Sequence, residues 1–214
     1  MTPHALGEFH SLQLGLVVDN VDPDSRGRIQ VELQATDMKV WASVISLSAG
    51  QDYGTAFVPR IDEIVVLAFI SPEMPLVLGS IWSGQSSMVT EADAVEDKYV
   101  IKTPAGSILQ FDDESQSKIH IQTPNQHHIT INDGSGGEIE IVKGGESIKL
   151  SSSGIDIQTS LKVNITASAS VNVTAATVKV DAAMSKFSGI VQADTVITNA
   201  VVSSSYTPGA GNVW

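Results

Sequence analysis

Apolar residues in the first eighty positions form short runs, and turn-forming residues separate these runs. A run over residues 14–18 is followed by Asp22-Pro23-Asp24 and then by apolar-polar alternation over residues 29–33. Proline presets a turn and alternation is typical of a half-buried strand, so this pattern predicts a hairpin. Further strands are predicted over 40–45, 64–70 and 76–82, with a break at Ala49-Gly50 and a turn at residues 61–63. Five strands in about seventy residues indicate a small closed barrel of the OB type.

The second half of the chain carries a repeat of apolar-x-apolar pairs separated by small or turn-forming residues. Successive pairs start 10, 10, 9, 7, 8, 8 and 7 residues apart: Ile119/Ile121, Ile129/Ile131, Ile139/Ile141, Ile148/Leu150, Ile155/Ile157, Val163/Ile165, Val171/Val173 and Val178/Val180. Each pair predicts a short strand with one apolar face, which cannot bury a core unless neighbouring repeats stack. This half is therefore predicted to be a β-solenoid or β-helix.

The short period decides how many chains the β-helix needs. A single-chain parallel β-helix takes roughly twenty residues or more per coil, whereas these pairs recur every 7 to 10 residues. Three chains that each supply one wall would close a prism with the Ile and Val pairs at its axis. We therefore predict an intertwined homotrimer, with roughly ten strands per chain at about 4.8 Å per level and a length on the order of 50 Å.

Composition places the boundary between the two halves. Eight of the eleven aromatic residues lie before residue 112, and residues 83–98 are rich in Ser, Ala, Asp and Glu without a clear period. The predicted fold class is all-β. An OB-fold barrel spans residues 1–84, a linker 85–98, a trimeric β-helix shaft 99–202 and a C-terminal tail 203–214.

Charge and motif content exclude several functions. Twelve basic and twenty-four acidic residues give a net charge of −12, which disfavours nucleic acid and anionic lipid partners held by charge. There is no cysteine, no Gly-x-Ser-x-Gly, no His-Glu-x-x-His and no phosphate-binding Gly-x-x-x-x-Gly-Lys. Residues 1–10 lack the pattern of a secretory leader, and no stretch predicts a transmembrane helix. We predict a non-enzymatic chain with no cofactor and no catalytic or metal-site residues.

Histidines and acidic residues in the repeat region were weighed as possible ligands. By the parity of Ile129 and Ile131, His127 would face the axis, where three copies offer imidazoles to a metal, whereas His128 and His120 would face solvent. The alternative is a histidine at an exposed corner. The cluster Asp112-Asp113-Glu114 could bind calcium or be a solvated turn. The loop over residues 132–137 is interpreted as a corner, and Asn164 and Asn172, which match the glycosylation pattern, as outward strand residues.

Residues 15–31, with the sequence Gly-Leu-Val-Val-Asp-Asn-Val-Asp-Pro-Asp-Ser-Arg-Gly-Arg-Ile-Gln-Val, resemble the opening of a known family. These are the spike proteins of contractile injection machines: baseplate assembly protein V, or central spike, in phages, and the valine-glycine repeat protein in type VI secretion. Further residues follow the family's OB-domain pattern in order: Trp41-Ala42, Ala49-Gly50, Gly54, 59–63 and 75–82. Residues 102–113 are similar to the family's entry into its trimeric β-helix, and residues 206–214 to the tails of phage members.

The resemblance implies a trimeric central spike in a virion tail baseplate or tailocin-like particle, assembled in the bacterial cytoplasm. Its OB domains would face the hub and tail tube, and its β-helix the target cell. Residues 83–98 leave no room for the lysozyme domain of T-even phage spikes, and no histidine beyond His128 could form a His-x-His iron site. A separate tip-capping protein or a bare end is therefore expected. Arg26, Arg28 and Arg60 would form ion pairs with the hub or stabilise turns.

The functional hypothesis is a cell-puncturing needle that transmits contraction force, with transient contact with the outer membrane of the target cell. One alternative is a β-helical glycan-binding or glycan-degrading tail protein, which would need an acidic or aromatic cleft on the shaft. The other is an OB-type module for single-stranded nucleic acid, which would need a basic, aromatic groove.

Overall fold

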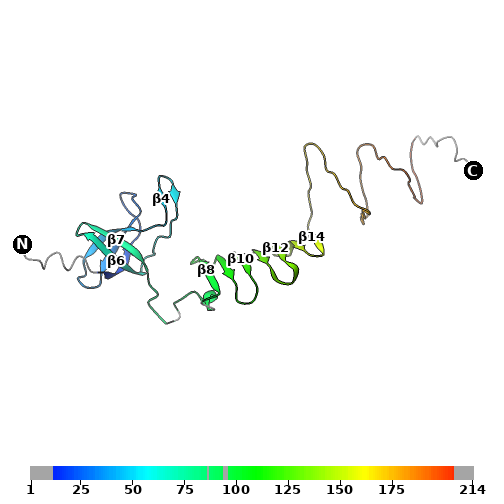
Figure 1. The fold of residues 1–214 in the computed structure, drawn as a ribbon. Coiled ribbons are helices and arrows are strands. Elements are labelled where there is room, and N and C mark those ends of the chain that lie inside the picture. The colour runs from blue at the N-terminus through cyan, green and yellow to red at the C-terminus, as the bar shows by residue number, and fades with distance from the viewer. Residues whose placement is uncertain (1–11, 86, 94–95, 205–214) are drawn as a thin grey trace, which may run out of the picture. The chain divides into compact units, whose positions relative to one another are not determined.

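The chain forms an all-β structure in a computed structural model that describes residues 12–85, 87–93 and 96–204 (Figure 1). It divides into a unit that ends at Val163 and a second unit that begins at Asn164. Two short 3-10 turns, η1 (Thr90–Ala92) and η2 (Gly134–Gly136), are the helical elements of the described residues. None of the described helices is long and apolar enough to cross a membrane.

Five strands near the N-terminus form a closed barrel: β1 (Gln13–Asp19), β2 (Arg28–Leu33), β3 (Lys39–Val44), β6 (Ile64–Ser71) and β7 (Met74–Ser80). Around the barrel the strand order is β1-β2-β3-β7-β6, and β1 pairs antiparallel with both β2 and β6. The single parallel contact joins β3 to β7 at Ser43–Leu76 and Val44–Val77. This is the Greek-key arrangement of an OB-fold, and it confirms the five strands predicted from alternation.

The barrel interior is filled by β-branched and aliphatic side chains. Alternate residues of each strand point inward, and the buried core consists of Val17, Ile29, Val31, Leu33, Ala42, Val65, Leu67, Phe69 and Val77. Gly15 also lies on the inner face of β1, where a Cβ atom would clash with the side chain of Val31. Glycine at this position therefore lets β1 approach its neighbours closely.

The turn between β1 and β2 is built around the carboxylate of Asp22. It accepts hydrogen bonds from the backbone N–H groups of Asp24, Arg26 and Arg28 at 2.9–3.1 Å. The Arg28 guanidinium adds two more, at 3.0 Å from Nε and 2.9 Å from Nη2, and lies 5.7 Å from the ring centroid of Trp41. The hydrogen bonds from Arg28 hold the pKa of Asp22 well below its usual range. Arg28 therefore stabilises its own turn, one of the two roles predicted for it.

The predicted break at Ala49-Gly50 is wrong. These residues form the short strand β4 (Ala49–Gly50), which pairs with β5 (Tyr53–Gly54) in a two-stranded hairpin. Asp52 adopts a left-handed conformation with φ of 63°, which allows the tight reversal. A two-residue strand is too short to show alternation, so the sequence pattern could not reveal it.

A second sheet follows η1 and contains seven strands in antiparallel, sequential order (Figure 1). They are β8 (Lys98–Lys102), β9 (Ile108–Asp112), β10 (Lys118–Gln122), β11 (His128–Asn132), β12 (Glu138–Lys143), β13 (Glu146–Ser151) and β14 (Gly154–Gln158). The first five predicted apolar pairs lie on β10 to β14. Neighbouring strands of this sheet thus come from one chain.

Residues 159–204 contain no strand in the single chain, although the sequence predicts three more apolar pairs there: Val163/Ile165, Val171/Val173 and Val178/Val180. Their side chains are exposed, from Val163 at 55 % to Ile165 at 75 %. No other described strand of the chain pairs with this segment, so its backbone lacks the neighbour that would make it a strand. The residues of the predicted tail from 205 onward, and the N-terminal residues 1–11, lie outside the described residues.

The Asp22 turn gives the barrel a specific acid sensitivity. Because the folded-state pKa of Asp22 is lowered, its stabilising effect is present above the ordinary aspartate pKa of about 3.9 and is lost as the pH falls below it. Asp22→Asn should lower the melting temperature of the barrel by several degrees at pH 7 and flatten its fall between pH 4 and 2. Thermal melts followed by tryptophan fluorescence test this. The matched control Asp24→Asn, which removes one contact to Arg28, should have a smaller effect.

Candidate functional site

The seven-stranded sheet has one apolar and one polar surface, and the apolar one is the candidate functional site. Side chains alternate along each strand, and the antiparallel register keeps the alternation in phase between strands. Ile119, for example, pairs with Phe111 on β9 and with Ile131 on β11. The surface, which we call the apolar face, consists of Tyr99, Ile101, Leu109, Phe111, Ile119, Ile121, Ile129, Ile131, Ile139, Ile141, Ile148, Leu150, Ile155 and Ile157.

The apolar face is open to solvent in the single chain. Twelve of its fourteen side chains are exposed, including Ile131 at 39 % and Ile157 at 62 %. At about 4.8 Å per strand, the seven strands make a continuous apolar strip on the order of 30 Å long. Monomeric proteins rarely expose an apolar patch of this extent, so the face needs a covering partner.

Four residues of the apolar face were missing from the pairs identified in the sequence. Tyr99/Ile101 on β8 and Leu109/Phe111 on β9 have the same apolar-x-apolar spacing as the later pairs. In each of these pairs an aromatic residue stands where the later pairs have an aliphatic residue, so a pattern defined by aliphatic residues does not include them. The spacing alone would have identified both strands.

The opposite surface of the sheet carries most of its polar side chains, and several of them pair with one another. Lys149 Nζ lies 2.8 Å from Glu138 Oε2. His120 is hydrogen-bonded to Thr130 Oγ1 at 2.9 Å and to Gln122 Oε1 at 3.1 Å. This polar face is therefore suited to remain in water while the apolar face is covered.

The segment that precedes β8, predicted as a linker, binds to the polar face through η1. Lys102 Nζ donates to Glu91 Oε1 at 2.6 Å, and Lys98 Nζ donates to Asp93 Oδ1 at 3.1 Å. Gln110 Nε2 donates to the Glu91 carbonyl oxygen at 3.4 Å. The hydrogen bond from Lys102 lowers the pKa of Glu91. These contacts attach the linker to β8 and β9 and leave the apolar face free.

Two of the three histidines in this region lie side by side on the polar face, and the third lies just before β11. His120 and His128 lie on the polar face with ring centroids 5.6 Å apart, and His128 Nε2 lies 4.0 Å from Glu140 Oε2. His127 precedes β11, and its Nδ1 is buried without a hydrogen-bond partner among the described residues. Within the described part of the chain, no group of three His, Cys, Asp or Glu side chains is placed to hold a metal ion. One chain alone therefore does not build a metal centre from these histidines.

The acidic cluster at residues 112–114 forms a turn in which each carboxylate has its own partner. Asp112 Oδ1 accepts from the Glu114 N–H at 3.1 Å, and Glu114 lies 2.8 Å from Lys98 Nζ. Asp113 accepts from the Ser117 hydroxyl at 2.8 Å. The carboxylates diverge toward separate partners, which is the geometry of a stabilised turn. The loop at 132–137 is likewise a corner, in which Asn132 Oδ1 accepts from the Gly134 N–H at 2.9 Å.

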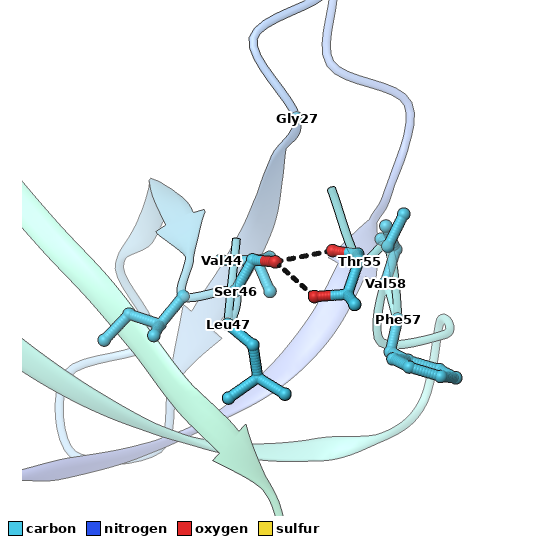
Figure 2. Close-up of a pocket in the computed structure, with 9 residues that line it drawn as sticks. Gly27, Val44, Ser46, Leu47, Thr55, Phe57 and Val58 are labelled. Carbon is cyan, nitrogen blue, oxygen red and sulfur yellow. Dashed lines mark hydrogen bonds between the residues drawn. The ribbon is translucent and has the colours of Figure 1, made fainter. Parts of the chain in front are cut away.

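A pocket of about 270 Å³ lies beside the end of β3 in the barrel (Figure 2). The Ser46 hydroxyl donates to the Thr55 carbonyl oxygen at 2.5 Å, which joins its two walls. The walls are mainly apolar, with Leu47, Phe57 and Val58 among the lining residues, and no lining side chain is titratable. None of the side chains that line the pocket is thus one that ordinarily serves as a general acid or general base.

The other two barrel arginines differ from Arg28. Arg26 and Arg60 are exposed, and neither forms an ion pair with the described residues, whereas Arg28 is paired with Asp22 and Asp24. Their guanidinium groups are thus open to solvent, and ion pairs with the hub, the second role named for them, stay a prediction.

Two family models match the chain, one over the barrel and one over the seven-stranded sheet from β10 onward. Residues 13–82 match a type VI secretion system/phage-baseplate injector OB domain, which corresponds to the closed barrel. Residues 118–185 match a phage baseplate V C-terminal trimerisation domain, which begins at β10 and continues beyond β14. No curated protein matches the chain. The match to a trimerisation domain supports a homotrimer, and the apolar face is the open surface that such a trimer has to cover.

Charge on the apolar face should prevent assembly, whereas charge on the polar face should be tolerated. Ile131→Asp gives up about 1.5–3 kcal/mol of apolar burial per chain and places a carboxylate in the interface. The matched variant Thr130→Asp changes the next residue of β11, which faces the other way. Sedimentation velocity should show a trimer for Thr130→Asp and lower-mass species for Ile131→Asp. Equal trimer content in the two variants would contradict the assignment of the apolar face as the interface.

Proposed function

The chain belongs to the phage baseplate V family, and on that premise we propose that it is the central spike of a contractile tail or injection-system baseplate. The two matched domains support a structural role in a baseplate and a homotrimer. The finer proposal is a needle that transmits the force of contraction and pierces the outer envelope of a bacterium. It would assemble in the bacterial cytoplasm before it is built into the particle.

The main observation that supports this proposal is the open apolar face. Three copies of a one-sided sheet can bury that face around a common axis and leave three polar faces in water. Such a prism has no free apolar surface, and separating one chain from it would expose fourteen large side chains. A needle needs this resistance to buckling and splitting, since contraction loads it along its axis.

We assign a separate role in the spike to each part of the chain. The barrel, within residues 1–84, would join the hub and tail tube, with Arg26 and Arg60 available for ion pairs with the hub. Residues 85–98 would act as the linker and residues 99–202 as the shaft. The tail at 203–214 would lie at the distal end, where a tip-capping protein is the proposed partner.

Few charges occur toward the proposed distal end. From residue 151 to residue 214 the charged residues are Asp156, Lys162, Lys179, Asp181, Lys186 and Asp194. A shaft surface of Ser, Thr, Ala and Val has a lower cost of desolvation than a highly charged one. This composition favours transient passage through a lipid layer over stable binding to it.

We propose that the chain is not an enzyme. The barrel pocket has no titratable lining residue, and the described residues offer no three-residue metal cluster. The net charge of −12 opposes binding of a nucleic acid by the OB barrel. A glycan-degrading role would need an acidic or aromatic cleft, and on the polar face Asp112 and Glu138 form ion pairs with lysines instead.

Particles that lack this chain test the puncturing role. Where such particles can still be assembled and triggered, the expected result is sheath contraction without permeabilisation of the target outer membrane. Uptake of a dye that the intact membrane excludes measures permeabilisation, and electron microscopy counts contracted sheaths in the same sample. Particles resupplied with the wild-type chain should regain permeabilisation. Normal permeabilisation by contracted particles without the chain would contradict the proposal.

A further inference from the structure

Glu146 binds the segment that leaves the seven-stranded sheet. Its Oε2 accepts from the Ser160 N–H at 3.3 Å, and its Oε1 accepts from the Ser160 hydroxyl at 3.1 Å. A hydrogen bond from Thr159 also reaches this carboxylate, and it is the main reason that the pKa of Glu146 is lowered. The Leu161 N–H in turn donates to Thr159 Oγ1 at 3.1 Å. Residues 159–161 are thus fixed to the first residue of β13.

These contacts lie where strand pairing within the chain ends. The final paired residues on this side of the sheet are Ser147 and Gln158, which link β13 to β14. Beyond Gln158 the described residues continue to 204 without another strand. Backbone N–H and C=O groups that are removed from water need partners, so this segment must find its strands elsewhere when the trimer forms.

A pocket of about 290 Å³ opens beside Glu146. Ile141, Ile148 and Ile157 from the sheet and Val163 from the departing segment form its apolar wall, and Lys143 and Lys162 also line it. Three of these side chains belong to the apolar face, so the pocket is continuous with the trimer interface. Its occupant should therefore come from the molecules that cover that face, which are copies of this chain.

The match to the trimerisation domain crosses this point without interruption. It runs from residue 118 to residue 185 and so includes strands paired within the chain and a segment that has no strand partner in it. The alternating pattern also continues, because Val163 and Ile165 repeat the spacing of Ile155 and Ile157. Both stretches are therefore part of one assembly with two modes of strand pairing.

We propose that Glu146 is a positioning residue that sets the place and register at which the three chains change from pairing within a chain to pairing between chains. The pocket beside it receives an aliphatic side chain from the 159–204 segment of a second copy. This inference rests on the proposed function, because it requires the trimer. A one-residue error in register would turn every following apolar side chain to the wrong face, so a fixed starting point has a clear physical use.

Hydrogen exchange on the full-length trimer tests the role of Glu146. Glu146→Ala should speed amide exchange in residues 164–204 at least tenfold and leave residues 118–158 unchanged. Glu146→Gln retains an acceptor oxygen and should restore part of the protection. The control Glu138→Ala removes the ion pair with Lys149 at the opposite end of β12 from Lys143, the residue that pairs with Glu146, and should leave residues 164–204 as in the wild type. Unchanged exchange in a trimeric Glu146→Ala variant would overturn the inference.

A second measurement uses the unaltered chain, so it does not depend on the folding of a variant. Trimers assembled from ¹⁴N-labelled and ¹⁵N-labelled chains are treated with a short amine cross-linker that can join Lys143 to Lys162. Cross-links between Lys143 and Lys162 of one label report the segment that each chain holds against its own pocket. Cross-links from either of these lysines to Lys179 or Lys186 of the other label are also expected, since the 164–204 segment of one copy should lie against the pocket of another. Cross-links confined to one label in a stable trimer would overturn this inference and leave the proposed function unaffected. A wild-type chain that remains a monomer would instead overturn the proposed function.

Discussion

The structure depends on a sheet only five or six residues wide that is apolar on one surface and has nothing of its own to cover that surface. Hydrophobic burial is the main favourable term in folding, and the second half of this chain cannot obtain it alone. Ile131, Ile141 and Ile148 remain more than a third exposed in the single chain. Burial of this face and assembly of the trimer are consequently one problem, because a single chain leaves the face exposed.

Edge strands of a β-sheet carry unpaired backbone N–H and C=O groups, and the two halves of the chain differ in how they protect these edges. The barrel closes on itself, with β1 between β2 and β6, and leaves no free edge. The seven-stranded sheet is open at β8 and β14. Near β8, η1 binds to the polar face, while the chain beyond β14 continues into the segment anchored by Glu146. Of these two edges, the one at β14 is thus followed by the residues for which we propose strand partners from other copies.

Much of the fold could be predicted because period-two alternation and turn chemistry are local signals. Ile29, Val31 and Leu33 indicated their strand, and all three are buried in the barrel core. The hairpin of β4 and β5 is too short to leave such a pattern, and aromatic residues masked the pairs at Tyr99 and Leu109. The end of pairing within the chain after Gln158 had no local signal, since Ile155/Ile157 and Val163/Ile165 look alike in sequence. Which chain supplies the neighbouring strand is a property of the assembly, and spacing does not encode it. The candidate sites show the same limit. The sequence placed the first five of the eight apolar pairs on strands correctly, whereas the last three lie in a segment without a strand, and the contacts of Glu146 with Ser160 required coordinates.

The most direct test of the central claim is the mass of the full-length wild-type chain by sedimentation equilibrium, with SDS resistance before boiling measured on the same sample. Each chain has a mass of 22.6 kDa. The account predicts a single species of about three times that mass, without monomer at micromolar concentration, that resists SDS until it is boiled. A well-folded monomer with an intact seven-stranded sheet would contradict it, because the apolar face would then be stable in water without a partner.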